Sequence, residues 1–170
     1  MIRQLSYDAV GQTSPGAEVW ADRPAGYRRH ARTVSIGRGR QRWEAVARAV
    51  LDWQIKTRSG FTVEPLTAGI RVREGADYQL TAGFGPLTVR EPVRVVAVVD
   101  LPARCGFAYG TLDGHPVSGE EAFIVHRTSD GEIRLTLRSL TRASRGGWRV
   151  AFPLLLAAQR YYRRRYLRAL

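Results

Sequence analysis

The sequence predicts an α+β fold in which a curved antiparallel β-sheet wraps around a long C-terminal α-helix. Three observations support this prediction: an early amphipathic helix follows a short strand, the middle of the chain is rich in strands, and the last segment has helical periodicity. Successive antiparallel strands form a strongly twisted sheet, and a long final helix can pack inside its curvature. We expect a single domain over residues 1–170, which is a normal size for one hydrophobic core.

The first 31 residues are expected to form an irregular lead-in that packs on the domain. Glycine and proline interrupt this segment repeatedly, and Tyr7, Trp20 and Tyr27 are the aromatic side chains that would anchor it. At this stage two roles stay open for the lead-in, because it either covers a cavity or braces the sheet.

A short strand is predicted over residues 32–36 and an amphipathic helix over residues 41–55. Apolar residues in the helix recur mostly at three- and four-residue spacing, while Glu44, Arg48 and Asp52 lie on its other side. This spacing predicts a helix that packs one face on the core.

Six segments in the middle of the chain have strand character. They are Gly69 to Arg73, Tyr78 to Phe84, Pro92 to Asp100, Gly106 to Leu112, Glu121 to Arg127 and Glu132 to Leu140. The last segment alternates apolar and polar residues, which places one face in a core and the other in water.

The C-terminal helix is predicted within residues 148–170, with a regular start near Phe152-Pro153. Its first half is apolar nearly all round, and its second half interleaves tyrosines with arginines. We therefore expect the helix to start buried and to end exposed. The cluster Arg163-Arg164-Arg165 is interpreted as a complement to the negative end of the helix dipole, with a nucleic-acid or lipid-headgroup patch as the alternative.

Composition argues against several classes of protein. No apolar run approaches the ~18 residues of a membrane-spanning helix, and the N-terminus lacks the apolar core of a secretory signal, so we expect a cytoplasmic protein. Cys105 is the only cysteine, which excludes an internal disulfide and a cysteine-based zinc cluster. Since His30, His115 and His126 are scattered along the chain, we expect neither a metal site nor a cofactor.

The chain is strongly basic, with a formal net charge of +12 and a pI near 11.1. Clustered cations favour a nucleic-acid partner through phosphate contacts and counterion release. However, Lys56 is the only lysine among the 27 basic residues, and such an arginine excess is what a GC-rich genome produces without selection for binding. Nucleic acid is therefore not the expected partner, although a nucleic-acid-associated role stays open as an alternative.

Ionisable and aromatic side chains are densest on one predicted β-hairpin, residues 106–123. Four of its residues are the candidates for catalysis if the protein is an enzyme: Tyr109, His115, Glu120 and Glu121. The candidate ligand-binding residues are Tyr78, Phe107, Tyr109, Thr111 and Phe123.

Alternation along the strands separates the two glutamates of this hairpin. Glu121 and Phe123 share one face, whereas Glu120 lies on the other. Which face points inward depends on a register that the sequence does not determine. We expect a buried glutamate to have a raised pKa and His115 to titrate near neutrality, so that either could exchange a proton. A purely structural role for the hairpin, with His115 in turn chemistry and a glutamate paired to arginine or to loop amides, is the alternative.

Short motifs spread over nearly the whole chain resemble an uncharacterised domain-of-unknown-function family known in bacteria and plants. The most specific are Gly106-Phe107-Ala108-Tyr109-Gly110-Thr111-Leu112, Gly114-His115-Pro116 and Gly119-Glu120-Glu121-Ala122-Phe123. The order of elements also resembles the helix-grip fold of the START and polyketide-cyclase-like superfamily. This resemblance implies a deep cavity between sheet and C-terminal helix that encloses an apolar or amphipathic ligand.

The expected function is binding of a small apolar or aromatic molecule in such a cavity, in the manner of a natural-product biosynthesis accessory protein. A cyclase-like or aromatase-like acid–base enzyme that uses residues 109–121 is the main alternative, and membrane insertion is not expected. Ligand identity and oligomeric state are not determined by these observations.

Overall fold

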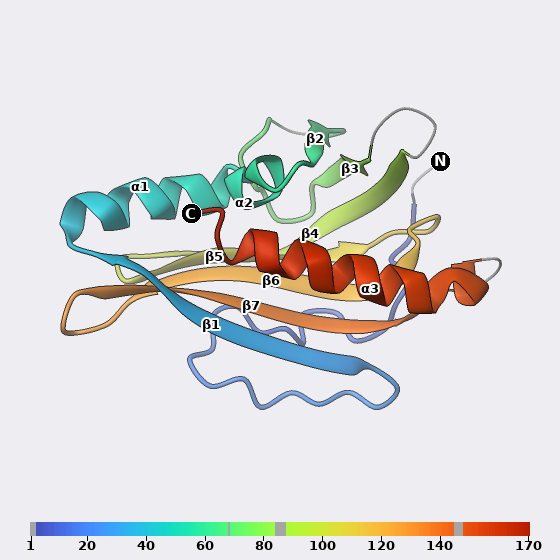
Figure 1. The fold of residues 1–170 in the computed structure, drawn as a ribbon, viewed down its shortest axis with the longest axis horizontal. Helices are drawn as coiled ribbons and strands as arrows, with labels where there is room; N and C mark the ends of the chain where they lie inside the picture. The colour runs from blue at the N-terminus through green and yellow to red at the C-terminus, as the bar shows by residue number, and fades with distance from the viewer. Residues whose placement is uncertain (1–2, 68, 84–87, 145–147) are drawn as a thin grey trace.

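The computed structural model describes residues 3–67, 69–83, 88–144 and 148–170. Its strands are β1 (Arg28–Arg38), β2 (Thr62–Pro65), β3 (Asp77–Ala82), β4 (Val89–Leu101), β5 (Arg104–Thr111), β6 (Val117–Arg127) and β7 (Glu132–Ala143). Its helices are α1 (Arg40–Leu51), α2 (Gln54–Arg58) and α3 (Trp148–Tyr166). In this described part of the chain the seven strands form one antiparallel sheet in the order β1-β7-β6-β5-β4-β3-β2 (Figure 1).

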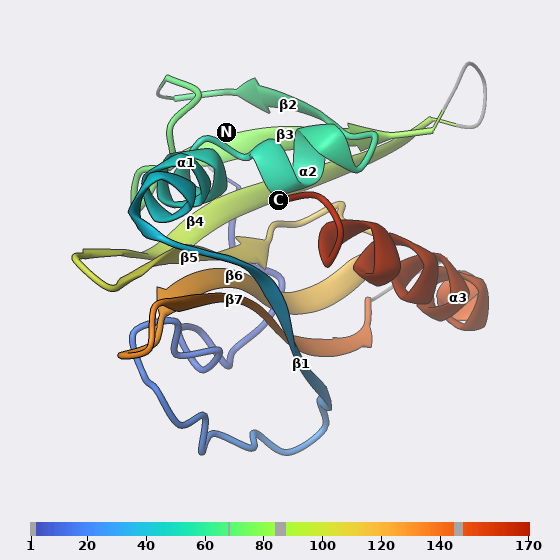
Figure 2. The same cartoon turned by 60° about the vertical axis from the view of Figure 1, so that its left-hand side comes forward.

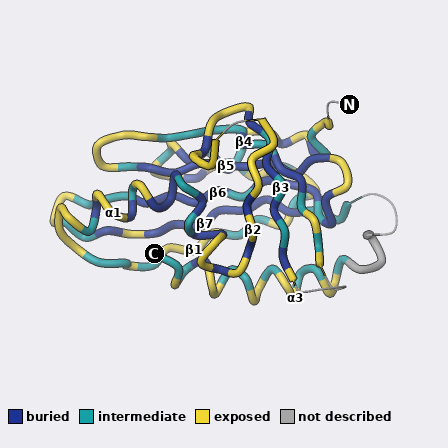
Figure 3. Tube along the Cα trace, turned by 90° about the horizontal axis from the view of Figure 1, so that it is seen from above, coloured by how far each residue is buried: buried dark blue, intermediate teal, exposed yellow. Residues whose placement is uncertain are grey.

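The sheet is curved, and its two faces are covered differently. All three helices lie on one face, and the lead-in crosses the opposite face (Figures 1 and 2). The main core lies on the helical face, where Trp43 and Val50 of α1 meet Phe107 and Phe123 of the central strands. The central strands are mostly buried in Figure 3, whereas α3 is a row of half-buried and exposed residues.

Most of the predicted strands are confirmed, with one exception. Residues 69–73 lie in a loop, and the edge strand that precedes β3 is the shorter β2. The end of the predicted strand at Phe84 lies outside the described residues. Pro65 suits this edge position because proline cannot donate a backbone hydrogen bond to a further strand.

The predicted helix over residues 41–55 is interrupted at Trp53. Trp53 has a left-handed backbone conformation with φ of 60°, so α1 ends and α2 begins in a new direction. Such a conformation is costly for a bulky residue. The buried indole ring offsets this cost, because it packs against Tyr78, Phe107 and Tyr109 at centroid distances of 4.9, 4.6 and 5.5 Å. Packing of this one ring therefore overrides the helical periodicity.

The burial of α3 is the reverse of the prediction. Leu154, in the apolar first half, is 77% exposed, whereas Tyr166 at the end is 4% exposed. Tyr162, Leu167 and Leu170 pack against the main core beside Tyr166. The tyrosine rings of the second half supply the docking surface, while Arg164, Arg165 and Arg168 beside them are exposed.

The lead-in braces the outer face of the sheet. Tyr7 and Trp20 form a second buried cluster there with Leu140 of β7. The guanidinium of Arg138, 4% exposed, donates hydrogen bonds to four backbone carbonyls of the lead-in, those of Thr13, Ser14, Ala17 and Glu18. Since α3 lies on the other face, the lead-in does not cover the space beneath α3.

Candidate functional site

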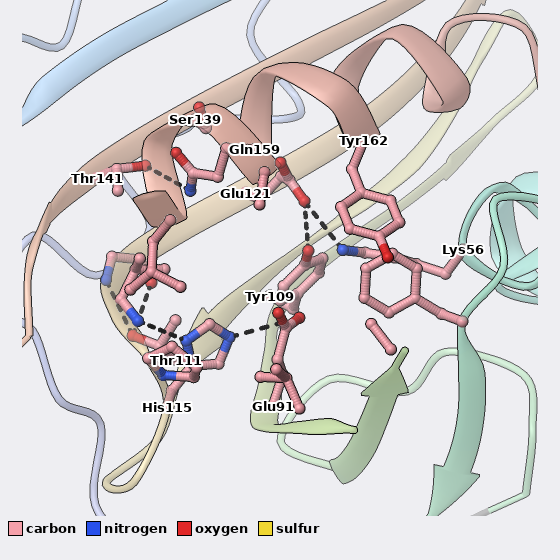
Figure 4. Close-up of a pocket in the computed structure, with 18 of the residues that line it drawn as sticks. Lys56, Glu91, Tyr109, Thr111, His115, Glu121, Ser139, Thr141, Gln159 and Tyr162 are labelled. Atoms are coloured by element: carbon pink, nitrogen blue, oxygen red, sulfur yellow. Dashed lines mark hydrogen bonds and ion pairs between the residues drawn. The ribbon is translucent and has the colours of Figure 1, made fainter. Parts of the chain in front are cut away.

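A pocket of about 250 Å³ lies between the sheet and α3 (Figure 4). Its walls come from strands β3 to β7, from α2 and the residues after it, and from the face of α3 that points to the sheet. The apolar part of the wall includes Phe61, Val89, Leu155, Ala158 and Tyr162. Because α3 packs on the core mainly through its second half, space remains between its first half and the sheet.

Four polar side chains form a connected cluster in the wall of this pocket. Tyr109 of β5 donates a hydrogen bond to Glu121 of β6, its directly paired neighbour in the sheet. The Lys56 Nζ atom lies 3.3 Å from Glu121 Oε2 and donates a 2.7 Å hydrogen bond to the Tyr166 hydroxyl. Lys56 reaches this point because α2 changes direction at Trp53. The cluster joins three parts of the fold that are distant in sequence.

The two tyrosines of the cluster stay protonated. Burial, together with the nearby charge of Glu121, raises the pKa of Tyr109 and of Tyr166 well above the ordinary value. Both hydroxyls therefore keep their proton and can donate a hydrogen bond throughout the physiological pH range.

A second polar pair, Glu91 and His115, lines another part of the pocket. The His115 Nε2 atom lies 3.8 Å from Glu91 Oε2, and His115 Nδ1 accepts a 3.1 Å hydrogen bond from the backbone of Val117. Burial raises the pKa of Glu91, an effect that the positive charge of Lys56 opposes and the negative charge of Glu121 reinforces. The raised pKa of Glu91 makes this carboxyl group suited to holding and releasing a proton in the pocket.

His115 does not titrate near neutrality as expected. Burial, with the positive charge of Lys56, lowers its pKa to about 3, so the ring is neutral at physiological pH. Its hydrogen bond from Val117 belongs to the turn between β5 and β6. The His115 side chain therefore both stabilises this turn and lines the pocket.

The buried neutral His115 predicts a loss of stability in acid. An unfolded chain takes up a proton near the ordinary value of 6.5, whereas the folded protein resists protonation down to a pH of about 3. As the pH is lowered from the first of these values to the second, we expect the free energy of unfolding to fall by up to about 1.4 kcal/mol per pH unit.

The variant His115→Asn, whose side-chain oxygen can accept the same backbone hydrogen bond, should flatten this dependence in urea unfolding between pH 7 and pH 4. Glu91 has the opposite effect on stability, because a raised carboxyl pKa favours the folded state as the pH falls. Since Glu91 is present in both proteins, His115→Asn and the wild type are compared at each pH. Equal pH slopes for His115→Asn and the wild type would contradict the prediction.

The structure separates the predicted site residues into two groups. Tyr109, Thr111, His115 and Glu121 line the pocket. Tyr78, Phe107 and Phe123 are fully or almost fully buried in the main core and are not among the lining residues that the structure describes.

Glu120 is also part of the pocket wall, but its carboxylate serves the opposite face of the sheet. It accepts hydrogen bonds from the Tyr7 hydroxyl at 2.7 Å, from the Gly11 amide at 2.7 Å, and from both the amide and the hydroxyl of Thr13. Glu120 anchors the lead-in, and Glu121 is the glutamate whose carboxylate joins the pocket cluster.

Among the residues of the two polar groups described above, sequence reasoning missed Lys56, Glu91 and Tyr166. Lys56 carried a signal, because it is the single lysine in a chain whose other basic residues are arginines. Glu91 precedes the predicted strand at Pro92, and Tyr166 belongs to the half of α3 that was expected to be exposed. Neither has a local pattern that separates it from an ordinary surface residue.

Several other kinds of site receive no support from the described residues. Within them, no three histidine, cysteine, aspartate or glutamate side chains gather in a set that could hold a metal ion. Over the same part of the chain, no helix combines the length and apolarity needed to cross a membrane. Cys105 is buried, and burial with hydrogen bonding to Asp100 raises its pKa to about 11, so its thiol is a poor nucleophile.

Solved structures with similar folds include three with low sequence identity. A hypothetical protein from Helicobacter pylori is 8% identical, with a TM-score of 0.60 over 82% of this chain and 86% of that one. The ginseng major latex-like protein 151 from Panax ginseng is 10% identical, with a TM-score of 0.52 over 83% and 99% of the two chains. Ara h 8.0201 is also 10% identical, with a TM-score of 0.51 over 83% and 96%. The last two are Bet v 1-like proteins, and the predicted helix-grip fold is confirmed.

Sequence comparison identifies relatives in bacteria and plants. A protein of Deinococcus radiodurans named UPF0548 protein is 36% identical over 151 residues, which cover 81% of this chain and 73% of that protein. An Arabidopsis thaliana protein of the same name is 27% identical over 141 residues, which cover 79% and 67%. The model of a family described as a domain of unknown function, DUF1990, matches residues 6–169. The chain has a helix-grip fold, and its motifs predicted a domain-of-unknown-function family of bacteria and plants. In agreement with that prediction, the chain belongs to the DUF1990 family.

Proposed function

We propose that this protein binds a small apolar or aromatic molecule in the pocket between the curved sheet and α3. The observation that carries the proposal is the pocket itself, a space of about 250 Å³ with a largely apolar wall and a few convergent polar groups. This combination is typical of sites for small organic molecules, in which the apolar wall supplies affinity and the polar groups supply orientation.

The way α3 packs also supports the proposal. Polar contacts tie α3 to β7, since Arg163 donates a 2.8 Å hydrogen bond to Ser139 and Gln159 donates one of 3.5 Å to Thr141. Leu155, in the first half, lines the pocket instead of filling the core. A ligand would give this apolar half of the helix a partner to pack against. These observations bear on ligand class, and the expected biosynthetic role stays a prediction.

The test fills the pocket with a large side chain introduced at one position of α3, Ala158. Ala158 lines the pocket and the adjacent Ala157 does not, although both are exposed. We expect the wild type and Ala157→Trp to bind 2-acetylnaphthalene or its hydrocarbon analogue 2-isopropenylnaphthalene in equilibrium dialysis, with one molecule per chain. Ala158→Trp should bind at least about tenfold more weakly, because the indole occupies the ligand's space.

Thermal unfolding of both variants establishes that they are equally folded before binding is compared. Failure of the wild type to bind either compound would overturn the proposal. Equal affinity of Ala158→Trp and Ala157→Trp would also overturn it, because binding would then occur elsewhere.

A further inference from the structure

We propose that the ligand of this pocket carries a neutral oxygen acceptor, such as a ketone, quinone or ester carbonyl, which is held by Lys56 and Tyr166. The inference rests on the proposed function and narrows it to a chemical class. Both side chains lie in the pocket wall and contact each other, so their unused donors can reach the same small group.

The count of hydrogen-bond donors in the cluster leads to this conclusion. An ammonium group has three N–H donors, and a tyrosine hydroxyl has one donor and can also accept. Among the described residues, Lys56 Nζ has two oxygen partners, the Tyr166 hydroxyl at 2.7 Å and Glu121 Oε2 at 3.3 Å. The Tyr166 hydroxyl accepts the bond from Lys56, and its own hydrogen has no acceptor in the same part of the structure. One N–H and one O–H are therefore available to a ligand oxygen.

The remaining surroundings of the ammonium group are aromatic. Its nitrogen lies 4.4 Å from the ring centre of Phe61, 4.5 Å from that of Tyr166 and 5.0 Å from that of Tyr109. Ring faces attract a cation but satisfy an N–H donor less well than an oxygen does. Lys56 is only 2% exposed, so bulk water competes weakly for this donor. A buried ammonium held in this way is preorganised for one more oxygen.

The charges around the pocket favour a neutral oxygen over a carboxylate. The ion pair of Lys56 and Glu121 is already neutral, and Glu91 adds a second carboxyl group to the same pocket. A ligand carboxylate held by Lys56 and Tyr166 would place another negative charge close to Glu121 and Glu91. A carbonyl oxygen accepts the two donors and adds no net charge.

The experiment compares two ligands that differ in one atom position. 2-Acetylnaphthalene and 2-isopropenylnaphthalene have nearly the same shape, but the first has C=O where the second has C=CH₂. We expect the wild type to bind the ketone about tenfold more tightly in equilibrium dialysis, the effect of one or two hydrogen bonds to a charged site. Binding of neither compound would overturn the proposed function, whereas equal binding of both would overturn this inference and leave the proposed function intact.

Two variants and a control test whether the preference for the ketone over the hydrocarbon comes from the donors of Lys56 and Tyr166. Tyr166→Phe removes one donor, and the double variant Lys56→Met/Glu121→Gln removes the ion pair without leaving a lone buried charge. Both should bind the two compounds with similar affinity. Tyr161→Phe is the matched control on α3, because Tyr161 is 56% exposed and does not line the pocket, and it should keep the tenfold preference. A preference that persists in both of the first two variants would contradict the inference.

The single lysine also permits a direct measurement. In protein labelled with ¹³C-lysine, the only side-chain signals come from Lys56. We expect the ketone to shift the Lys56 Cε signal clearly more than the hydrocarbon does. Identical shifts with both compounds would place the carbonyl away from Lys56 and overturn the assignment.

Discussion

Replacing Lys56 by methionine is expected to lower the free energy of unfolding by about 3 kcal/mol. Lys56 is 2% exposed and lies 3.3 Å from Glu121, whose side chain is 14% exposed. The substitution keeps the apolar stem but removes the charge, so it leaves the Glu121 carboxylate buried without its ion-pair partner. Urea unfolding at pH 7, followed by circular dichroism, measures the loss.

The double variant Lys56→Met/Glu121→Gln is the control that separates the charge from the packing. Glutamine can still accept the hydrogen bond from Tyr109, so this variant should recover stability to within about 1 kcal/mol of the wild type. Wild-type stability of Lys56→Met alone would show that Glu121 does not depend on Lys56. A double variant as unstable as Lys56→Met would attribute the loss to packing.

Replacing Glu120 by glutamine should have an effect of similar size on the other face of the sheet, about 3 kcal/mol. The carboxylate of Glu120, which is 3% exposed, accepts four hydrogen bonds from Tyr7, Gly11 and Thr13. One oxygen of the carboxylate becomes an NH₂ group in glutamine, and this group cannot accept the bonds made to it. One backbone amide of the lead-in, that of Gly11 or of Thr13, then faces an NH₂ group in place of its acceptor, and the hydroxyl bonded to the same oxygen loses that acceptor too.

Amide hydrogen exchange locates this effect. We expect the amide of Gly11 or of Thr13, whichever bonds to the oxygen that becomes the NH₂ group, to lose most of its protection in Glu120→Gln, while the amides of the main core keep theirs. Glu44→Gln is the matched control, since the Glu44 side chain is 53% exposed and pairs with the exposed Arg40, and it should change stability by less than about 0.5 kcal/mol. Unchanged protection at Gly11 and Thr13 would contradict the anchoring role of Glu120.

The two adjacent glutamates illustrate how far the sequence predicts the site. Period-two alternation correctly separates Glu120 from Glu121, because the geometry of a strand sends successive side chains to opposite faces. Alternation does not tell which face has helices on it. The pairing of β6 with β5 and β7 and the position of α3 settle that question, and they place Glu121 beside Tyr109.

The course of the chain at Trp53 shows why part of the site was not predictable. Apolar spacing predicts one helix over residues 41–55, and no local signal marks a left-handed residue at Trp53. The break depends on the space that Tyr78, Phe107 and Tyr109 leave for the indole, and these residues come from later strands. Lys56 reaches the pocket only because of this break.

Local patterns in the sequence are sufficient for the α+β class, the order of most elements, the hairpin of residues 106–123 and the two faces of its strands. Short-range spacing and alternation report the environment of a side chain along its own element, which is why these features can be read from the chain. The tertiary structure alone decides that α3 docks through its tyrosines, that the lead-in braces the outer face, and that Lys56, Glu91 and Tyr166 meet the hairpin in one pocket. Each of these depends on contacts between segments far apart in sequence, whose packing energies outweigh the local preferences of the residues involved.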